Sequence, residues 1–347
     1  MDQKTLEELF LKKPHLVILG AGATVAAIPN GDKNGIKCSV MNNFLQNIGK
    51  ENLLDNVKLE TQSKNLEDIY SELYEKGEKE LCHNLEHEIY NYFQEFTLPD
   101  ELTIYDLLVL SMRKKDCIAS FNWDPLLIQA RQRMSNITED LPQMVFLHGN
   151  VQAGYCEKCR EFGYIKNKCH TCGQPFSKTP LLYPVKHKNY NENLFIREQW
   201  DTLEYFISYA AIITIFGYSA PKSDIEAIKL IKKAFSKNGE TARIFDSIEI
   251  IEKPGFDSNE LSEAWQYLAG KENGHIHIYN SFYDSLLSEF SRRSVEGYTK
   301  RNISGWWGSS TISYSDKVRH TKYAIWKLVQ PLLKAENKND FSVIGKE

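Results

Sequence analysis

Short apolar runs recur along the chain, with longer amphipathic stretches between them. Runs of this length without polar alternation are typical of strands that are buried on both faces. Their alternation with helical stretches predicts an α/β fold with a doubly wound, Rossmann-like, mostly parallel sheet. The runs are Leu16–Leu19, Cys117–Ala119, Met144–Leu147, Ala211–Phe216, Ile248–Ile251 and Ile276–Tyr279.

Two segments interrupt this alternation of predicted strands and helices. Residues 37–110 carry apolar side chains at three- and four-residue spacing, as in Leu66, Ile69, Tyr70 and Leu73, which predicts a helical insertion. Residues 150–180 contain paired cysteines and few apolar residues, too few to fold by burial alone. We therefore expect a helical lobe over the sheet and a small module that something other than a core stabilises.

The end of the chain differs from the rest in composition. After residue 285 it becomes polar and mildly basic, passes Trp306 and Trp307, and ends in a predicted helix from Asp316 to Lys334. We expect residues 286–347 to form a C-terminal helical segment that contacts another subunit or a partner, because adjacent exposed aromatic residues are common at interfaces. Alternatively, the two tryptophans close the domain core.

The composition narrows the functional classes. Of 347 residues, 42% are hydrophobic and 25% are charged, as in ordinary globular proteins. A formal net charge of -4 gives no basic surface of the kind that drives general binding to nucleic acids or anionic membranes. The N-terminus lacks a signal-peptide pattern, and no run of about 18 apolar residues occurs. We therefore expect a cytoplasmic protein without nucleic-acid or membrane partners.

Four of the seven cysteines form two Cys-x-x-Cys pairs, Cys156 with Cys159 and Cys169 with Cys172. Each pair supplies two thiolates, and the short loop between the pairs brings all four to one tetrahedral site. This spacing predicts a structural zinc ion. Four thiolates leave no position for water, so this zinc is not expected to be catalytic. The other cysteines read as small core residues, namely Cys38, Cys82 and Cys117.

Candidate binding and catalytic residues lie where the predicted strands end. Parallel strands bring their carboxyl ends to one edge of the sheet, where ligands bind in open α/β folds. The first strand runs into a glycine turn of the kind that lets backbone N–H groups approach a phosphate. The residues after the first four strands are Gly20, Ala21, Gly22, Thr24, Asn122, Asp124, His148, Gly217 and Ser219.

Each of these features also has a purely structural interpretation. A strand-turn-helix junction needs glycine whether or not it binds phosphate, and Val25 replaces the third glycine of the dehydrogenase pattern. A lone histidine such as His148 is commonly a hydrogen-bonded structural residue. Asn122 and Asp124 precede Pro125, where a helix start would use them as caps. Taken singly, the residues leave both interpretations open.

The order of these motifs, with the paired cysteines between them, resembles the sirtuin family from residue 14 to about residue 285. In that family the glycine turn holds the phosphates of NAD, the asparagine and aspartate line the nicotinamide-ribose pocket, and the histidine is the catalytic base. The resemblance implies catalytic roles for His148, Asn122 and Asp124, and a single NAD-binding catalytic domain over residues 1–285. It implies NAD contacts for Gly20, Ala21, Gly22, Thr24, Asn122, Asp124, Gly217, Ser219 and Asp224.

The sequence departs from the sirtuin deacylases at two places. Ala27–Asp32 lacks the aromatic residue and the arginine that follow the first turn in deacylases, and Leu181–Tyr190 replaces the strand edge on which an acylated peptide lies. The chain looks more like the prokaryotic sirtuin-like branch associated with phage defence. The similar segments are Asn65–Tyr70, Tyr183–Lys186, Trp200 and Ile215–Asp224.

Members of that branch hydrolyse NAD, so the resemblance implies an NAD hydrolase (NADase) that releases nicotinamide and ADP-ribose as a regulated antiviral effector. It also implies a homo-oligomer and a separately encoded HerA-type ATPase as partner. Two alternatives are an NAD-dependent protein-lysine deacylase and a non-catalytic sensor of NAD or ADP-ribose. The presence of His148 beside Asn122 favours chemistry over sensing.

Overall fold

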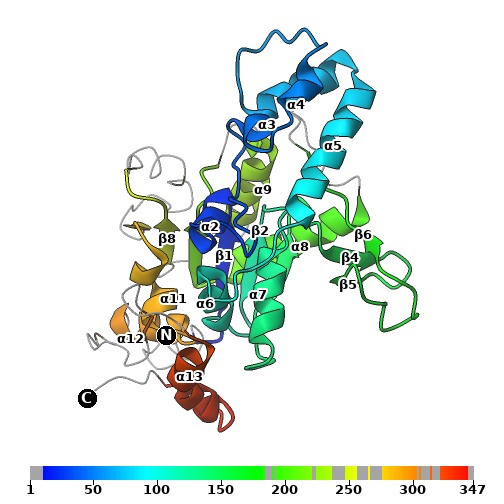
Figure 1. Ribbon diagram of the computed structural model, residues 1–347. Coiled ribbons are helices and arrows are strands. Elements are labelled where there is room, and N and C mark those ends of the chain that lie inside the picture. Colours follow the sequence, from blue (N-terminus) through cyan, green and yellow to red (C-terminus); the bar gives the residue numbers. More distant parts are fainter. Residues whose placement is uncertain are drawn as a thin grey trace.

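A parallel β-sheet forms the centre of the structure (Figure 1). In this computed structural model, the described residues are 11–183, 190, 193–220, 224–236, 247–255, 265, 276–302, 305, 313–314 and 321–342. Within them the sheet has six strands in the order β3-β2-β1-β7-β8-β9. The strands are β1 (His15–Leu19), β2 (Cys117–Ser120), β3 (Gln143–Phe146), β7 (Ile212–Phe216), β8 (Ser247–Ile251) and β9 (Ile276–Tyr279).

Each predicted apolar run lies in one of these strands, so the predicted doubly wound α/β fold is confirmed. All five strand pairings are parallel, and every residue of β1, β7 and β8 is buried. The strand order reverses between β1 and β7, which both lie in the middle of the sheet. In open parallel sheets a ligand crevice forms outside the carboxyl ends of the strands at such a reversal.

Helices cover both faces of the sheet. Successive side chains of β1 alternate between two hydrophobic clusters: Val17 and Leu19 join one, and Leu16 and Ile18 join the other. The first cluster includes residues of α2 (Ala21–Ala27), α6 (Ile104–Leu110) and α7 (Leu126–Met134). The second includes residues of α8 (Leu194–Tyr209) and α9 (Ile225–Ser236).

The segment from residue 37 to residue 110 is helical, as predicted. It contains α3 (Phe44–Asn47), the 3-10 helix η1 (Glu51–Leu54), α4 (Leu66–Lys76), α5 (Lys79–Gln94) and α6. Figure 1 shows α4 and α5 projecting as a lobe at the top of the view. The buried faces of both helices join the same hydrophobic cluster as α2, so the lobe packs against the sheet domain through a continuous core.

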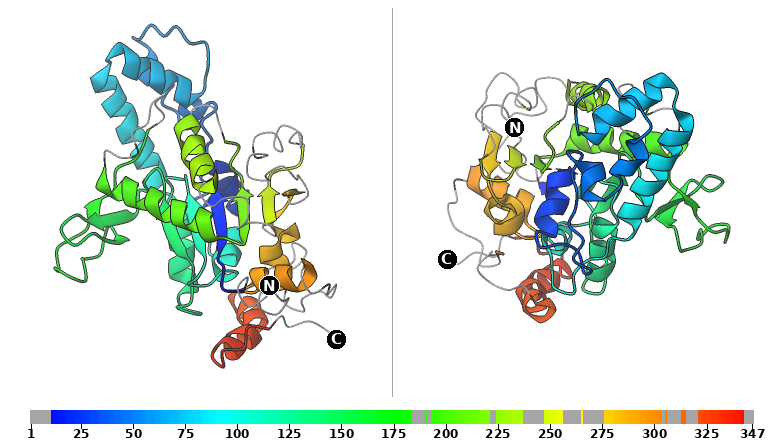
Figure 2. Two further views of the ribbon diagram at one scale, coloured as in Figure 1. Left: turned by 180° about the vertical axis from the view of Figure 1, so that it is seen from behind. Right: turned by 45° about the horizontal axis from the view of Figure 1, so that its top comes forward.

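The cysteine module is a separate three-stranded antiparallel sheet. Its strands are β4 (Ala153–Cys156), β5 (Glu161–Tyr164) and β6 (Ser177–Lys178), in the order β5-β4-β6. Both views in Figure 2 show this module projecting from the molecule on the side away from the C-terminal helices. Its own buried cluster consists of Cys156, Cys169 and Phe176.

The C-terminal segment forms α11 (Leu286–Glu289), α12 (Ser294–Asn302) and α13 (Lys322–Glu336), and the short 3-10 helix η5 (Phe282–Asp284) precedes it. α13 begins at Lys322, because the side chain of Thr321 accepts a hydrogen bond from the Ala324 N–H and caps the helix there. Residues 316–320 of the predicted last helix lie outside the described residues. Trp306 and Trp307 lie outside the described residues.

Buried arginines hold this segment in place. Arg292 and Arg293 both bind the carboxylate of Glu336 in α13, and Arg292 also donates to the carbonyl oxygens of Leu110 and Met112 at the end of α6. Buried charges need such partners, so this cluster fixes α13 against the sheet domain.

Among the described residues, no helix is long and apolar enough to cross a membrane.

Candidate functional site

A cavity of about 850 Å³ opens at the carboxyl ends of the central strands. Its walls come from the turns after β1, β2, β3, β7 and β8, and from the start of α4. A volume of this size is typical of sites for small molecules and cofactors. All of the residues that sequence reasoning selected for cofactor binding or catalysis line it: Gly20, Ala21, Gly22, Thr24, Asn122, Asp124, His148, Gly217, Ser219 and Asp224.

The glycine turn after β1 packs backbone to backbone against the turn after β7. The N–H of Gly20 donates to Phe216 O and the N–H of Gly22 donates to Gly217 O, each at 3.0 Å. A Cβ at Gly20 would lie 2.5 Å from Gly217 O, and Gly217 itself has φ +62°. Close packing therefore requires both glycines. Among the described residues no acceptor bonds to the N–H of Ala21, which leaves it as a donor at the cavity wall.

Four polar residues form one hydrogen-bonded group, here called the cavity cluster: Thr24, Asn122 and Asp124, which line the cavity, and Tyr105, which contacts Thr24 and Asn122. The Thr24 hydroxyl donates to Asp124 Oδ2 and lies 2.7 Å from the Tyr105 hydroxyl. Asp124 Oδ1 accepts the Leu126 N–H, which starts α7. The predicted capping role of Asp124 therefore coexists with its place in the cavity wall.

The side-chain amide of Asn122 has a fixed direction. Its nitrogen lies within hydrogen-bond distance of three acceptors, Gly20 O at 2.8 Å, Thr24 Oγ1 at 3.0 Å and the Tyr105 hydroxyl at 3.2 Å, so one of its two N–H groups is shared between acceptors. Because the nitrogen is turned toward these acceptors, Oδ1 is the atom that Asn122 presents to the cavity. The site thus offers a hydrogen-bond acceptor at the end of β2.

Burial sets the protonation of this cluster. It raises the pKa of Tyr105 well above its ordinary value, with the nearby Asp124 carboxylate as a second cause, so the phenol stays neutral and can donate. Burial also raises the pKa of Asp124, against hydrogen bonds from Thr24 and the Leu126 N–H that favour the carboxylate.

His148 follows the neighbouring strand β3, lines the same cavity and is also buried. Its Nε2 is 3.2 Å from the Tyr190 hydroxyl and 3.9 Å from Asp224 Oδ1, and its ring packs edge-on against Phe121. The Tyr218 hydroxyl donates to the other oxygen of Asp224 at 3.0 Å. His148 Nε2 thus has a hydroxyl oxygen and a carboxylate oxygen as neighbours.

Three residues at the site were not selected from the sequence: Tyr105, Asn150 and Tyr190. The amide nitrogen of Asn150 donates to the Asp124 carbonyl at 2.6 Å and joins the turns after β2 and β3. Asn150 could have been predicted as a site residue, because it directly follows His148-Gly149 at the end of a strand. Tyr105 gave none, because it lies in a stretch whose apolar pattern reads as core, and Tyr190 gave none, because its polar sequence neighbours form no motif.

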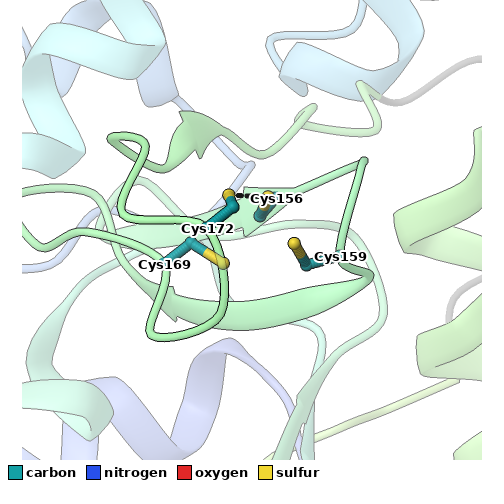
Figure 3. Close-up of side chains that lie close together, drawn as sticks. All are labelled: Cys156, Cys159, Cys169 and Cys172. Carbon is teal, nitrogen blue, oxygen red and sulfur yellow. Dashed lines mark hydrogen bonds between the residues drawn. The ribbon is translucent and has the colours of Figure 1, made fainter.

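The cysteine module brings its four thiols together at one point (Figure 3). The Sγ atoms of Cys156, Cys159, Cys169 and Cys172 all lie within 4.8 Å of one another. Tetrahedral zinc with Zn–S bonds of about 2.3 Å requires S–S distances of roughly 3.8 Å, and the Cys156 and Cys172 sulfurs are 3.6 Å apart. A hydrogen bond from the Gln174 N–H lowers the pKa of Cys172 to about 7, which favours a thiolate. This donor set fits the predicted structural zinc ion.

Comparisons with known proteins give structural neighbours only. No family model and no curated protein matches the chain. A Sir2 homologue in complex with NAD aligns at 13% identity and a TM-score of 0.38, over 86% of this chain and 94% of that one. Sir2 with a p53 peptide and NAD aligns at 14% and 0.37, over 88% and 99%. The strand order β3-β2-β1-β7-β8-β9 defines the doubly wound fold.

Proposed function

We propose that the chain binds NAD in this cavity and cleaves the bond between nicotinamide and ribose. The observation that carries the proposal is the placement of two groups in one cavity: Asn122 Oδ1, an acceptor held in a fixed direction, and His148, a proton acceptor beside a carboxylate. Both follow sheet strands at the edge where dinucleotides bind in α/β folds. The sirtuin-like order of the motifs supports the same conclusion.

The residues present fit a dinucleotide. The Ala21 N–H faces the cavity between two glycines that allow no side chain, so a pyrophosphate can approach the backbone there. Gly217 and Ser219 form the facing turn. Thr24 acts indirectly, because its hydroxyl is used within the cavity cluster. We therefore assign phosphate binding to the backbone of the two turns and not to the Thr24 side chain.

Water is the nucleophile in the proposed reaction. The bond from ribose to the pyridinium nitrogen breaks with its electron pair moving to nicotinamide, water adds to the ribose, and one proton is released. Asn122 Oδ1 orients a ribose hydroxyl or the water, and His148 takes the proton. Asp224 stabilises the imidazolium that results. The products are nicotinamide and ADP-ribose.

Within the same proposal, residues 1–285 are the catalytic domain and the four-cysteine module stabilises it without taking part in the chemistry. We further propose a regulated role in antiviral defence, because an uncontrolled NAD hydrolase would deplete the NAD of its own cell. Assembly as a homo-oligomer and contact with a HerA-type ATPase would supply the control, through residues 286–347 or the helical lobe. An NAD hydrolysis rate that is independent of protein concentration and of any partner would contradict this part.

Protein-lysine deacylation uses the same cofactor groups, with an acyl-lysine in place of water. The described residues after β6, up to Tyr183, contain no further strand, and the Leu182 N–H donates to the His148 carbonyl at 2.9 Å. The chain therefore pairs with itself beside His148, where a peptide strand would need a free edge. Residues 184–189, the rest of the segment that replaces the deacylase peptide edge, lie outside the described residues.

One experiment separates the candidate functions. The purified full-length chain is incubated with NAD, with and without an acetyl-lysine peptide, and the products are separated by chromatography. Hydrolysis predicts equal amounts of nicotinamide and ADP-ribose without peptide. Release of nicotinamide only with peptide, together with acetyl-ADP-ribose, would establish deacylation. Binding of ADP-ribose without any cleavage of NAD would establish a sensor.

A further inference from the structure

One hydroxyl group at the site has no role in the proposed chemistry. Tyr105 is almost completely buried in α6, and its hydroxyl contacts both Thr24 and Asn122. We infer that Tyr105 is a positioning residue: its hydroxyl holds the Asn122 amide so that the oxygen, and not the nitrogen, faces the cavity. This inference rests on the proposed function and adds a residue to it.

The structure fixes the hydroxyl of Tyr105 in place. Thr103 and Asp106 form a capping box at the start of α6, with both the N–H and the hydroxyl of Thr103 donating to Asp106 Oδ2. The guanidinium of Arg133 in α7 then binds both oxygens of Asp106, at 2.8 Å and 2.5 Å. Paired buried charges of this geometry allow little movement, so α6 presents Tyr105 rigidly.

The hydrogen bonds of the cavity cluster run in one direction. Asp124 as a carboxylate can only accept, so the Thr24 hydroxyl donates to it. The Thr24 oxygen then accepts from the Tyr105 hydroxyl, and both oxygens accept from the Asn122 amide. The neutral phenol is required for this order, and burial keeps it neutral. Every polar hydrogen of the four side chains is thus used within the group or on Gly20 O, which leaves Asn122 Oδ1 as an acceptor.

Loss of the Tyr105 hydroxyl removes one of the acceptors that hold the amide. An asparagine amide has nearly the same shape when it is turned by half a revolution, so hydrogen bonds alone decide which end faces the cavity. In the turned state Asn122 offers N–H groups to the cavity where a ribose hydroxyl or water needs an acceptor. The fold would persist, while the amide would be turned in about nine of ten molecules or more, which a tenfold or larger loss of kcat requires.

The test is Tyr105→Phe in the full-length chain. The aromatic ring keeps its packing, and only the hydroxyl is lost. We expect kcat for nicotinamide release to fall about ten- to a hundredfold, as misplacement of a reacting group typically does, while KM stays within about threefold. Titration with ADP-ribose measures the fraction of intact sites, so that kcat refers to sites that bind.

The matched control is Tyr155→Phe in the cysteine module. Its hydroxyl donates to Glu198 at 2.6 Å, and its side chain does not line the cavity. This variant loses a comparable hydroxyl and should keep the wild-type kcat and KM. An equal loss of kcat in both variants would assign the effect to general destabilisation and overturn the inference.

Thr24 provides a second test within the same group. Thr24→Val removes the hydroxyl that accepts from the Asn122 amide and should lower kcat as Tyr105→Phe does. Because both residues act on one amide, Thr24→Val combined with Tyr105→Phe should be no more than about threefold worse than the worse single variant. Fully multiplicative losses would indicate independent structural effects and contradict the inference.

The experiments distinguish an error in the proposed function from an error in the inference about Tyr105. A wild-type chain that binds ADP-ribose but cleaves no NAD overturns the proposed function and this inference with it. A wild-type chain that cleaves NAD, with Tyr105→Phe equally active at full site occupancy, overturns the inference alone. Active wild type with a selective loss of kcat in Tyr105→Phe supports both.

Discussion

Two buried polar groups in this molecule are built alike and differ in one respect. The cavity cluster ends in the carboxylate of Asp124. A second group, here called the sealed cluster, consists of His15 in β1, Thr214 in β7, Glu249 in β8 and Ser294 in α12, and ends in the carboxyl group of Glu249. There His15 lies 2.8 Å from the Ser294 hydroxyl and 2.7 Å from the Thr214 hydroxyl, which donates to Glu249.

The difference between the two clusters is access to the cavity. All four side chains of the sealed cluster are buried, and the second oxygen of Glu249 accepts the Leu286 N–H at the start of α11. The cavity cluster instead leaves Asn122 Oδ1 without a partner among the described residues and directs it to the cavity. A satisfied buried network stabilises a fold, whereas an oriented group that is left open can act on a ligand. We therefore expect activity to depend on the cavity cluster and stability on the sealed one.

The largest effect is expected at His148. We predict that His148→Ala lowers the rate of NAD cleavage by about 10²–10⁴-fold, the usual contribution of a general base. The fold should persist, because the residue lies at the end of a strand and at the cavity wall. Nicotinamide release and circular dichroism check the two halves of this prediction. An unfolded variant would assign His148 to the structure, and wild-type turnover would remove it from the mechanism.

Removal of the metal from the cysteine module should change stability before activity. We predict one zinc ion per chain, and a markedly lower thermal midpoint for Cys169→Ser, because structural zinc contributes directly to folding. Below that midpoint, kcat should stay close to wild type. Elemental analysis and thermal unfolding measure these outcomes. Folded wild-type protein without stoichiometric metal would refute the zinc site.

The sealed cluster should make the free energy of unfolding depend on pH. Burial raises the pKa of Glu249 to about 7, against an ordinary value of 4.5. Between these values the native state binds more protons than the unfolded state, so the free energy of unfolding falls as pH rises. The shift corresponds to about 3 kcal/mol across this window.

Glu249→Gln should abolish that contribution. Glutamine resembles the protonated side chain, so the stability of the variant relative to wild type should increase from pH 4.5 to above pH 7. NAD cleavage should be unchanged, because the residue does not line the cavity. Denaturant unfolding of both proteins at each pH gives the difference directly. A constant difference across the window would show that Glu249 does not titrate there.

The smallest effect is expected for Ser294→Ala, which removes the hydroxyl beside His15 Nδ1. We predict a loss of about 1–2 kcal/mol in unfolding free energy, the typical cost of one buried hydrogen bond with an unsatisfied partner. Activity should match wild type. A loss of NAD cleavage in the folded variant would break the proposed division between the two clusters.

Much of the fold was predictable because its signals are local. Strands buried on both faces appear as continuous apolar runs, and all of the predicted runs lie in the central sheet. The cysteine cluster followed from spacing alone, since two Cys-x-x-Cys pairs on a short loop have few other arrangements. The start of α13 at Lys322 was not predictable in this way, because it depends on the cap at Thr321 and not on apolar periodicity.

The site was predictable only as far as strand ends determine it. Asn122 and His148 follow neighbouring strands, and the topology of a parallel sheet brings them to one edge. The contact of His148 with Asp224 depends on how the turn after β7 is placed, which no local pattern encodes. Tyr105 lies in an apolar helix, where a tyrosine is indistinguishable from a core residue until the Thr24 and Asn122 contacts are known.

The most direct test of the central claim is Asn122→Ala, with unfolding free energy and NAD cleavage measured on the same preparation. Thr24 and Tyr105 still bond to each other in this variant, and Gly20 O still accepts the Ala23 N–H. We therefore predict that Asn122→Ala loses only about 1 kcal/mol of unfolding free energy and that its kcat falls about a hundredfold or more. Unchanged cleavage of NAD, or a loss of activity that only follows unfolding, would contradict it.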